Sequence, residues 1–154
     1  MEKYIEINRS LWNNKTPIHV KSEFYNVPAF KAGKSSLNPA ELESLGDVNG
    51  KTLLHLQCHF GMDSLSWSRL GAKVTGVDLS ETAIETAREL NQELGLEAEF
   101  ICSNIYDLKD AHDKKYDIVF TSYGTIGWLP DLDKWADIVS HFLKPGGTFF
   151  IAEF

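Results

Sequence analysis

The chain has few cysteines, a deficit of basic residues and no long apolar run. Its two cysteines, Cys58 and Cys102, are typical of a reduced, cytoplasmic protein. The 15 Lys and Arg residues face 22 Asp and Glu residues, and the resulting net charge of −7 would repel nucleic-acid phosphates. No apolar run is long enough to span a bilayer, and residues 1–4 contain no apolar signal core. We therefore predict a cytoplasmic protein that binds neither nucleic acid nor membrane.

The stretch 50–80 organises the rest of the sequence. Short apolar runs at 53–56 and 74–77 are bounded by turn residues and predict two buried strands. Between them lies a helix-length segment that Gly71 can end. Strand, glycine loop, helix and strand make one βαβ unit, and Asp78 closes its second strand. This layout is typical of nucleotide-binding half-sheets, in which an acid about 20 residues after the loop accepts ribose hydroxyls.

Strands and helices continue to alternate after this unit. A helix capped by Ser80 ends at Gly95, and a later helix opens at Asp131 or Asp133. Three further apolar runs predict strands, at 99–102, 116–121 and 148–154. The alternation predicts an α/β fold: a Rossmann-like, doubly wound, mostly parallel sheet with helices on both faces. We assign this sheet to one domain, residues 50–154.

Residues 1–49 predict a helical and irregular extension that precedes the sheet. Apolar residues between Tyr4 and Trp12 suggest a loose amphipathic helix. A second, short helix has Asn38 as its N-cap, followed by Pro39 and by Glu41 at the position that completes a capping box. The stretch between the two helices is irregular and rich in aromatic residues and lysine.

The first strand and its loop resemble the first motif of class I S-adenosylmethionine-dependent methyltransferases. Those enzymes carry the pattern h-h-D-h-G-x-G-x-G, and the aligned residues here are Leu53-Leu54-His55-Leu56-Gln57-Cys58-His59-Phe60-Gly61. His55 replaces the acid, Gln57 and His59 replace two glycines, and Gly61 is kept. A subgroup of bacterial small-molecule methyltransferases is similar in this Gln-Cys-His form, and the Lys-Pro-Gly-Gly turn at 144–147 also resembles the family.

The resemblance implies S-adenosylmethionine as cofactor and a small molecule as methyl acceptor. Ligands of parallel sheets bind beyond the carboxyl ends of the strands, where four loops of this chain converge. The candidate cofactor contacts in these loops are Gln57, Gly61, Asp78, Leu79, Asn104, Ile105, Ser122 and Tyr123. In this scheme Asp78 accepts the ribose hydroxyls, while Leu79, Asn104 and Ile105 contact adenine.

Each candidate also has a purely structural interpretation. Asp78 could be an acid stabilised at a helix N-terminus, and Gly61 a simple strand-to-helix turn. Asn104 could bond its own backbone in a turn, and Tyr123 could be a core tyrosine with any polar partner. The side chain of Gln57 either points inward and bonds the methionine part of the cofactor or points outward.

Methyl transfer from a sulfonium is an in-line displacement, in which the protein mainly supplies orientation and excludes water. A general base is needed only for a protonated nucleophile. Tyr123, His19 and Tyr25 are the candidates, and the sequence does not choose among them. The cluster of His55, Cys58 and His59 lacks a usual zinc spacing, so we predict no metal.

Two further expectations concern the ends of the chain. In the family an N-terminal extension often folds over the cofactor as a lid, and deleting residues 1–36 would remove such a lid from this chain; alternatively, the aromatic residues of the extension only pack on the outer helices of the sheet. The family also has a sixth and a seventh strand, so a non-catalytic S-adenosylmethionine-binding module, or a fragment of a longer methyltransferase, is the alternative function. The strand at 148–154 would then be an apolar edge, which invites self-association.

Overall fold

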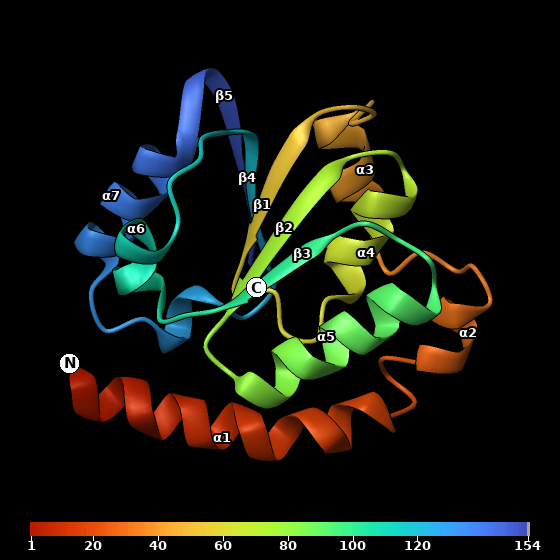
Figure 1. Cartoon of the computed structure of the whole chain (residues 1–154), viewed down its shortest axis with the longest axis horizontal. Coiled ribbons are helices and arrows are strands. Elements are labelled where there is room, and N and C mark those ends of the chain that lie inside the picture. Colours follow the sequence, from red (N-terminus) through yellow and green to blue (C-terminus); the bar gives the residue numbers. More distant parts are fainter. Residues whose placement is uncertain (154) are drawn as a thin grey trace.

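The computed structural model describes residues 1–153, and its centre is a five-stranded, wholly parallel sheet (Figure 1). The strand order is β3-β2-β1-β4-β5. The strands are β1 Thr52–Leu56, β2 Lys73–Asp78, β3 Glu99–Cys102, β4 Tyr116–Ser122 and β5 Leu143–Ala152. This order reverses direction next to β1, so the predicted doubly wound, Rossmann-like sheet is confirmed.

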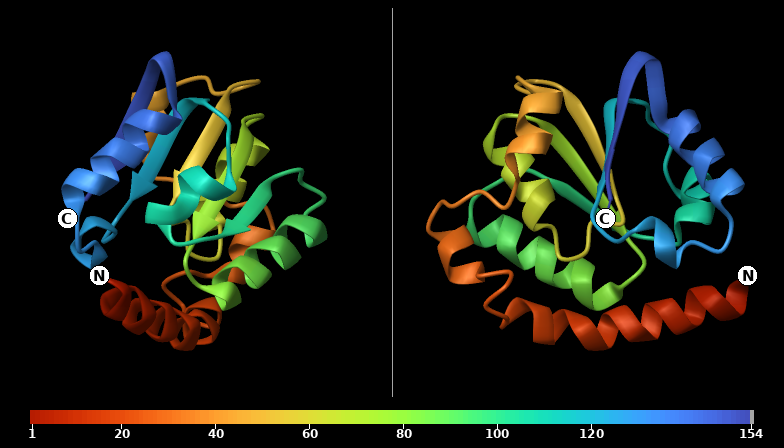
Figure 2. Two further views of the ribbon diagram at one scale, coloured as in Figure 1. Left: turned by 60° about the vertical axis from the view of Figure 1, so that its left-hand side comes forward. Right: turned by 180° about the vertical axis from the view of Figure 1, so that it is seen from behind.

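Helices cover both faces of the sheet (Figures 1 and 2). One face carries α2 Val27–Lys31, α3 Pro39–Leu45, α4 Met62–Arg69 and α5 Glu81–Glu93; the other carries the 3-10 helix η1 Ile105–Asp107, α6 Leu108–Ala111 and α7 Leu132–Phe142. Successive β1 side chains point to opposite faces, so Leu53 joins one core cluster while Leu54 and Leu56 join the other. A further 3-10 helix, η2 Ile126–Trp128, follows β4.

The local start and stop signals of the sequence are confirmed. The Ser80 hydroxyl accepts the Ala83 N–H at 3.1 Å and opens α5. The Glu41 carboxylate accepts the Asn38 N–H at 3.0 Å, as a capping box requires. Of the two acids proposed to open α7, the N-cap is Asp131, whose carboxylate accepts the Lys134 N–H at 2.9 Å.

The start of β5 differs from the prediction. The strand begins at Leu143 rather than Thr148, because Leu143 already pairs with Tyr116 before the regular register resumes at Ile118 and Thr148. The Lys-Pro-Gly-Gly segment lies between these two pairs, at the shift in register, and Gly146 has a φ of 78° there, as a turn would require. The predicted end of this strand, Phe154, lies outside the described residues.

The first helix, α1 Glu2–Val20, extends well past the predicted segment that ends at Trp12, and it crosses below the carboxyl ends of the strands (Figure 2). The stretch predicted to be irregular also contains α2. The Asn13 side chain joins it to α5, accepting the Ser80 hydroxyl at 2.5 Å and donating to Glu81 at 2.9 Å. Farther along the extension, Val27 and Phe30 are buried in the same core cluster as the sheet. Residues 1–49 thus contribute both a helix over the strand ends and part of the core. Within residues 1–153, no helix is long and apolar enough to cross a membrane.

Candidate active site

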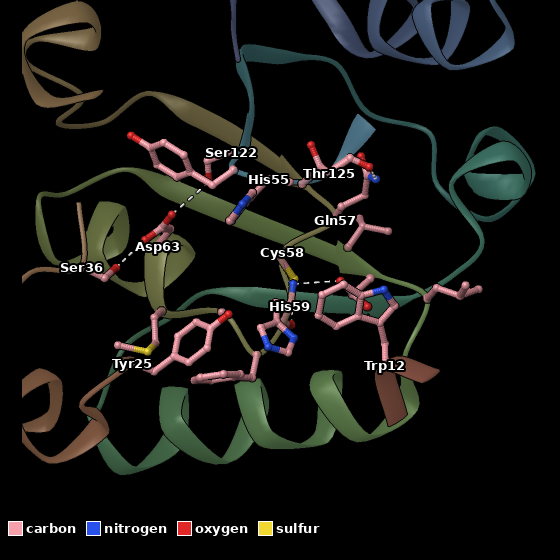
Figure 3. Close-up of a pocket in the computed structure, with 18 of the residues that line it drawn as sticks. Trp12, Tyr25, Ser36, His55, Gln57, Cys58, His59, Asp63, Ser122 and Thr125 are labelled. Carbon is pink, nitrogen blue, oxygen red and sulfur yellow. Dashed lines mark hydrogen bonds between the residues drawn. The ribbon is translucent and has the colours of Figure 1, made fainter. Parts of the chain in front are cut away.

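A cavity of about 790 Å³ opens at the carboxyl ends of the strands (Figure 3). Its wall includes the loops after β1, β2, β3 and β4, together with residues from α1 and the segment 24–38. All the predicted cofactor contacts line it: Gln57, Gly61, Asp78, Leu79, Asn104, Ile105, Ser122 and Tyr123. Tyr25 and Tyr123, two of the candidate bases, also line the cavity, whereas His19 lies behind its wall and contacts the lining residues His59, Tyr25 and Trp12.

The carboxylate of Asp78 is held by the backbone on two sides. One oxygen accepts the His59 N–H at 2.8 Å and the other accepts the Ser80 N–H at 2.9 Å. Burial raises the pKa of Asp78, while these N–H donors oppose the rise. Each carboxylate oxygen has a second lone pair, so Asp78 can still accept hydroxyls from a ligand.

The loop after β1 keeps a glycine-like backbone without most of the glycines. Gln57 has φ 56° and His59 has φ 55°, both in the left-handed region. The Gln57 amide donates to the Thr125 carbonyl at 3.1 Å, and its own oxygen is buried without a partner in the described structure. At Gly61, with φ 85°, a Cβ would lie 2.9 Å from the Phe100 ring. Packing alone therefore explains why position 61 is glycine.

The adenine-side candidates lie together after β2 and β3. The Asn104 oxygen accepts the Tyr106 N–H at 3.1 Å and caps η1. This is the contact expected of the turn interpretation, and the second lone pair of the oxygen is left for a ligand. Ile105 is buried and Leu79 half-buried, so both offer apolar surface to the cavity.

Three histidines lie at or beside the cavity. His55 is buried and lies 2.6 Å from the Ser64 hydroxyl through Nδ1; burial lowers its pKa to about 3. His59 Nε2 lies 2.8 Å from His19 Nδ1, and burial, aided by His19, lowers the pKa of His59 to about 3. In residues 1–153, no group of three or more His, Cys, Asp or Glu side chains could hold a metal ion.

Aromatic side chains from the extension close one side of the cavity. The Trp12 ring makes edge contacts with His59 at 5.1 Å and with Trp128 at 5.4 Å between centroids. Tyr25 contacts both His59 and Phe60, at 5.7 and 5.2 Å. Trp12 and Trp128 were not predicted as site residues, because only the fold brings α1 and η2 together.

Two acids that sequence reasoning missed hold parts of the cavity wall, and of these two Asp63 lines the cavity itself. Asp63, in the first turn of α4, accepts the Ser36 hydroxyl at 2.5 Å and the Ser122 hydroxyl at 3.0 Å. Glu153, just after β5, accepts the N–H groups of Gly124 and Thr125, each at 2.8 Å, and so fixes the loop after β4. The rule that ligands bind at strand ends could have indicated Glu153, whereas Asp63 carried no comparable signal.

Tyr123 lies next to Ser122 in that loop, with φ 48°. Its hydroxyl accepts from the Asn38 side chain at 3.1 Å, which ties the loop to the start of α3. Burial raises the pKa of Tyr123, and burial also raises that of Tyr25. Both phenols are therefore protonated at neutral pH.

Comparisons with known proteins agree with this geometry. A family described as "Methyltransferase domain" matches residues 53–147, which is more than half of the chain. The ubiquinone biosynthesis O-methyltransferase of Shewanella pealeana is 31% identical over 121 residues, which cover 76% of this chain and 51% of that protein. Its counterpart from Bordetella avium is 30% identical over 76% of this chain and 50% of that protein. The chain thus spans about half the length of the curated relatives it matches.

Solved structures show the same fold. A structure described as "DhpI-SAH complex structure" is 24% identical, has a TM-score of 0.72, and aligns over 99% of this chain and 70% of that one. A structure described as "Conversion of a Disulfide Bond into a Thioacetal Group during Echinomycin Biosynthesis" is 33% identical and has a TM-score of 0.64. The match covers 73% of this chain and 49% of that one. The family match and the parallel sheet lead to one conclusion: this chain belongs to the class I S-adenosylmethionine-dependent methyltransferases.

Proposed function

We propose that this chain binds S-adenosylmethionine in the cavity and transfers its methyl group to a small-molecule acceptor. The observation that supports this best is the position of Asp78, a carboxylate with free lone pairs at the end of β2, facing a cavity beside the strand-order reversal. The volume of about 790 Å³ is within the usual range for a ligand pocket.

The strand order sets the orientation of the cofactor. Asn104 and Ile105 follow β3, Asp78 ends β2, Gln57 follows β1 and Ser122 ends β4. Adjacent strand ends are separated by about 4.8 Å, so these positions form a row across the cavity. We place adenine at the β3 end, ribose on Asp78 and the methionine part toward β1 and β4.

When bound, the cofactor supplies an electrophilic methyl group on a sulfonium. The residues of this chain bind and orient it and keep water out, through Trp12, Tyr25 and Trp128 on the open side. Tyr25 and Tyr123 keep their protons at neutral pH, because burial raises both pKa values. Burial and Lys15 lower the pKa of His19, but its Nδ1 faces His59. Proximity and orientation are therefore the main catalytic effects that we assign to the site.

The acceptor is a small molecule in this proposal. The negative charge of the chain and the aromatic wall of the cavity favour an uncharged or cationic organic compound over a nucleic acid. The relatives named as O-methyltransferases make a hydroxyl oxygen the first acceptor atom to test. Both cysteines are free, which supports a cytoplasmic location.

Calorimetry with S-adenosylhomocysteine and with NAD tests the binding half of the proposal. We expect binding of the former and none of the latter; the reverse result would refute the cofactor assignment. Turnover is then measured as S-adenosylhomocysteine released from S-adenosylmethionine over a panel of phenols, alcohols and amines. Binding without turnover on the whole panel would favour the non-catalytic alternative.

A further inference from the structure

Asp63 is an acid in the cavity wall with no ion-pair partner among residues 1–153. Its carboxylate lies between the hydroxyls of Ser36 and Ser122, as Figure 3 shows, and both hydroxyls donate to it. None of the ion pairs found among residues 1–153 includes Asp63. Burial raises the pKa of Asp63, and the nearby Glu41 carboxylate contributes to the rise. A carboxylate in such surroundings is stabilised by a cation that enters the cavity.

The neighbours of Asp63 provide no positive charge. His55 is buried beside Ser64 and neutral, with a pKa lowered to about 3 by burial. Tyr25 also lines the cavity, and the charge of Asp63 adds to the effect of burial in raising the pKa of this phenol. Lys34 is the only Lys or Arg among the described lining residues, and its side chain is exposed. A ligand in the cavity can therefore supply a positive charge that the described lining does not place beside Asp63.

The fold places Asp63 at the end of the cavity away from the ribose site. Asp78 is the last residue of β2, and Ser122, whose hydroxyl donates to Asp63, is the last residue of β4. In the sheet, β1 lies between these two strands. Two strand spacings separate such positions by about 10 Å. A cofactor with its ribose on Asp78 and its methionine part toward β4 therefore extends in the direction of Asp63.

We propose that Asp63 is the counter-ion of the α-ammonium group of the cofactor. The ammonium has three N–H donors, and each Asp63 oxygen keeps a lone pair beside the hydroxyl that it already accepts. The sulfonium, the other cationic group of S-adenosylmethionine, has no N–H and cannot use these lone pairs. This inference rests on the proposed function, since it presupposes that S-adenosylmethionine occupies the cavity.

Three ligands separate the ammonium from the rest of the cofactor. S-adenosylhomocysteine carries both the amine and the carboxylate, its decarboxylated analogue keeps only the amine, and 5′-methylthioadenosine lacks both. Calorimetry measures all three on the wild type, on Asp63→Asn, and on the control Asp137→Asn, which removes one negative charge from the exposed surface of α7. Thermal unfolding of each variant shows whether it remains folded.

We expect Asp63→Asn to weaken binding of the two ligands that carry the amine by about 10-fold to 150-fold, as for a lost hydrogen bond to a charged group. Its effect on 5′-methylthioadenosine should stay within about twofold, and Asp137→Asn should change none of the three affinities.

Several outcomes would overturn the assignment. Equal losses for all three ligands would show that Asp63 only supports the wall through Ser36 and Ser122. Unchanged affinities together with lost turnover would make Asp63 a general base instead. A loss confined to S-adenosylhomocysteine would mean that Asp63 responds to the carboxylate. If the wild type itself binds none of the three, the proposed function fails before Asp63 is tested.

Discussion

Replacing Asp78 is the most direct test of how the chain holds a ribose. The Asp78→Asn variant keeps the shape of the side chain but removes its charge and one acceptor oxygen. Hydrogen bonds to a charged group contribute about 1.5–3 kcal/mol, so affinity for S-adenosylhomocysteine should fall by about 10-fold to 150-fold. The more drastic Asp78→Ala should lose at least as much, because it removes both oxygens.

The structure adds a second effect to that estimate. The Asp78 carboxylate also accepts the His59 and Ser80 N–H groups, so Asp78→Ala leaves two donors without partners. Each unsatisfied buried donor costs about 1–3 kcal/mol of folding free energy. Burial raises the pKa of Asp78, because the charged carboxylate is unfavourable in a buried position. Removing this carboxylate therefore offsets part of the loss in folding free energy. Asp78→Asn is therefore the cleaner probe of binding, and Asp78→Ala the probe of loop stability.

A 2′-deoxy analogue of S-adenosylhomocysteine makes the test specific for ribose. In the wild type this analogue should bind more weakly than the parent compound, and in Asp78→Asn most of that difference should disappear. The control is Glu89→Gln, which removes an exposed charge on α5 outside the cavity. Calorimetry that finds the same 2′-deoxy penalty in the wild type and in Asp78→Asn would refute the ribose role.

Three further predictions concern pH, the N-terminal helix and the sheet edge. The folded pKa of His55 is about 3 and lies below the unfolded value of 6.5, so its contribution to stability is lost as pH falls from 6.5 toward 3. In this range His55 should add about 1.4 kcal/mol per pH unit to the pH dependence of the unfolding free energy, and chemical unfolding of His55→Asn should lack this contribution. An equal pH dependence in the wild type and the variant would contradict the prediction. Deletion of residues 1–20 should raise the dissociation rate of S-adenosylhomocysteine in stopped flow while circular dichroism stays native-like; an unchanged rate would exclude a lid. Because β5 is one of the two sheet edges in the described residues, light scattering should show a species larger than a monomer, and Ile151→Lys on that strand should reduce its amount.

The structure makes the lid test sharper than the sequence could. From the sequence alone, residues 1–36 would be removed together as one lid. Val27 and Phe30 are buried in the core with the sheet, so that larger deletion would remove core side chains along with α1. The first 20 residues lie over the cavity and contribute only the partly buried Ile5 and Val20 to the edges of the core clusters.

Much of the fold could be predicted because its signals are local. The alternation of Leu53, Leu54 and Leu56 and the Ser80 cap each depend on residues a few positions apart. The start of β5 could not be predicted, because Leu143 extends the strand by pairing with Tyr116, a contact absent from the local pattern. The loops of the site were predictable for a different reason: a parallel sheet brings all carboxyl strand ends to one edge.

The parts of the site that escaped prediction are those set by distant partners. Asp63 bonds Ser36, 27 residues before it, and Ser122, 59 residues after it. In the sequence it is one acid in the first turn of a helix, where a carboxylate is favourable in any case. His19 and His59 are 40 residues apart, and their contact depends on where α1 lies.

The loop after β1 shows why the family resemblance survives the loss of its glycines. Gln57 and His59 adopt the left-handed backbone that glycine adopts without strain, and each such residue costs about 1 kcal/mol or more. Hydrogen bonds hold that path: the His59 N–H donates to Asp78, and the Gln57 amide donates to the Thr125 carbonyl. The side chains that stand in place of the family's glycines also make contacts that glycine could not make. Gln57 contacts the loop after β4, and His59 contacts His19 and Trp12 of α1. The loop thus adopts the positive φ angles that glycine favours, while its side chains connect it to the elements that enclose the cavity.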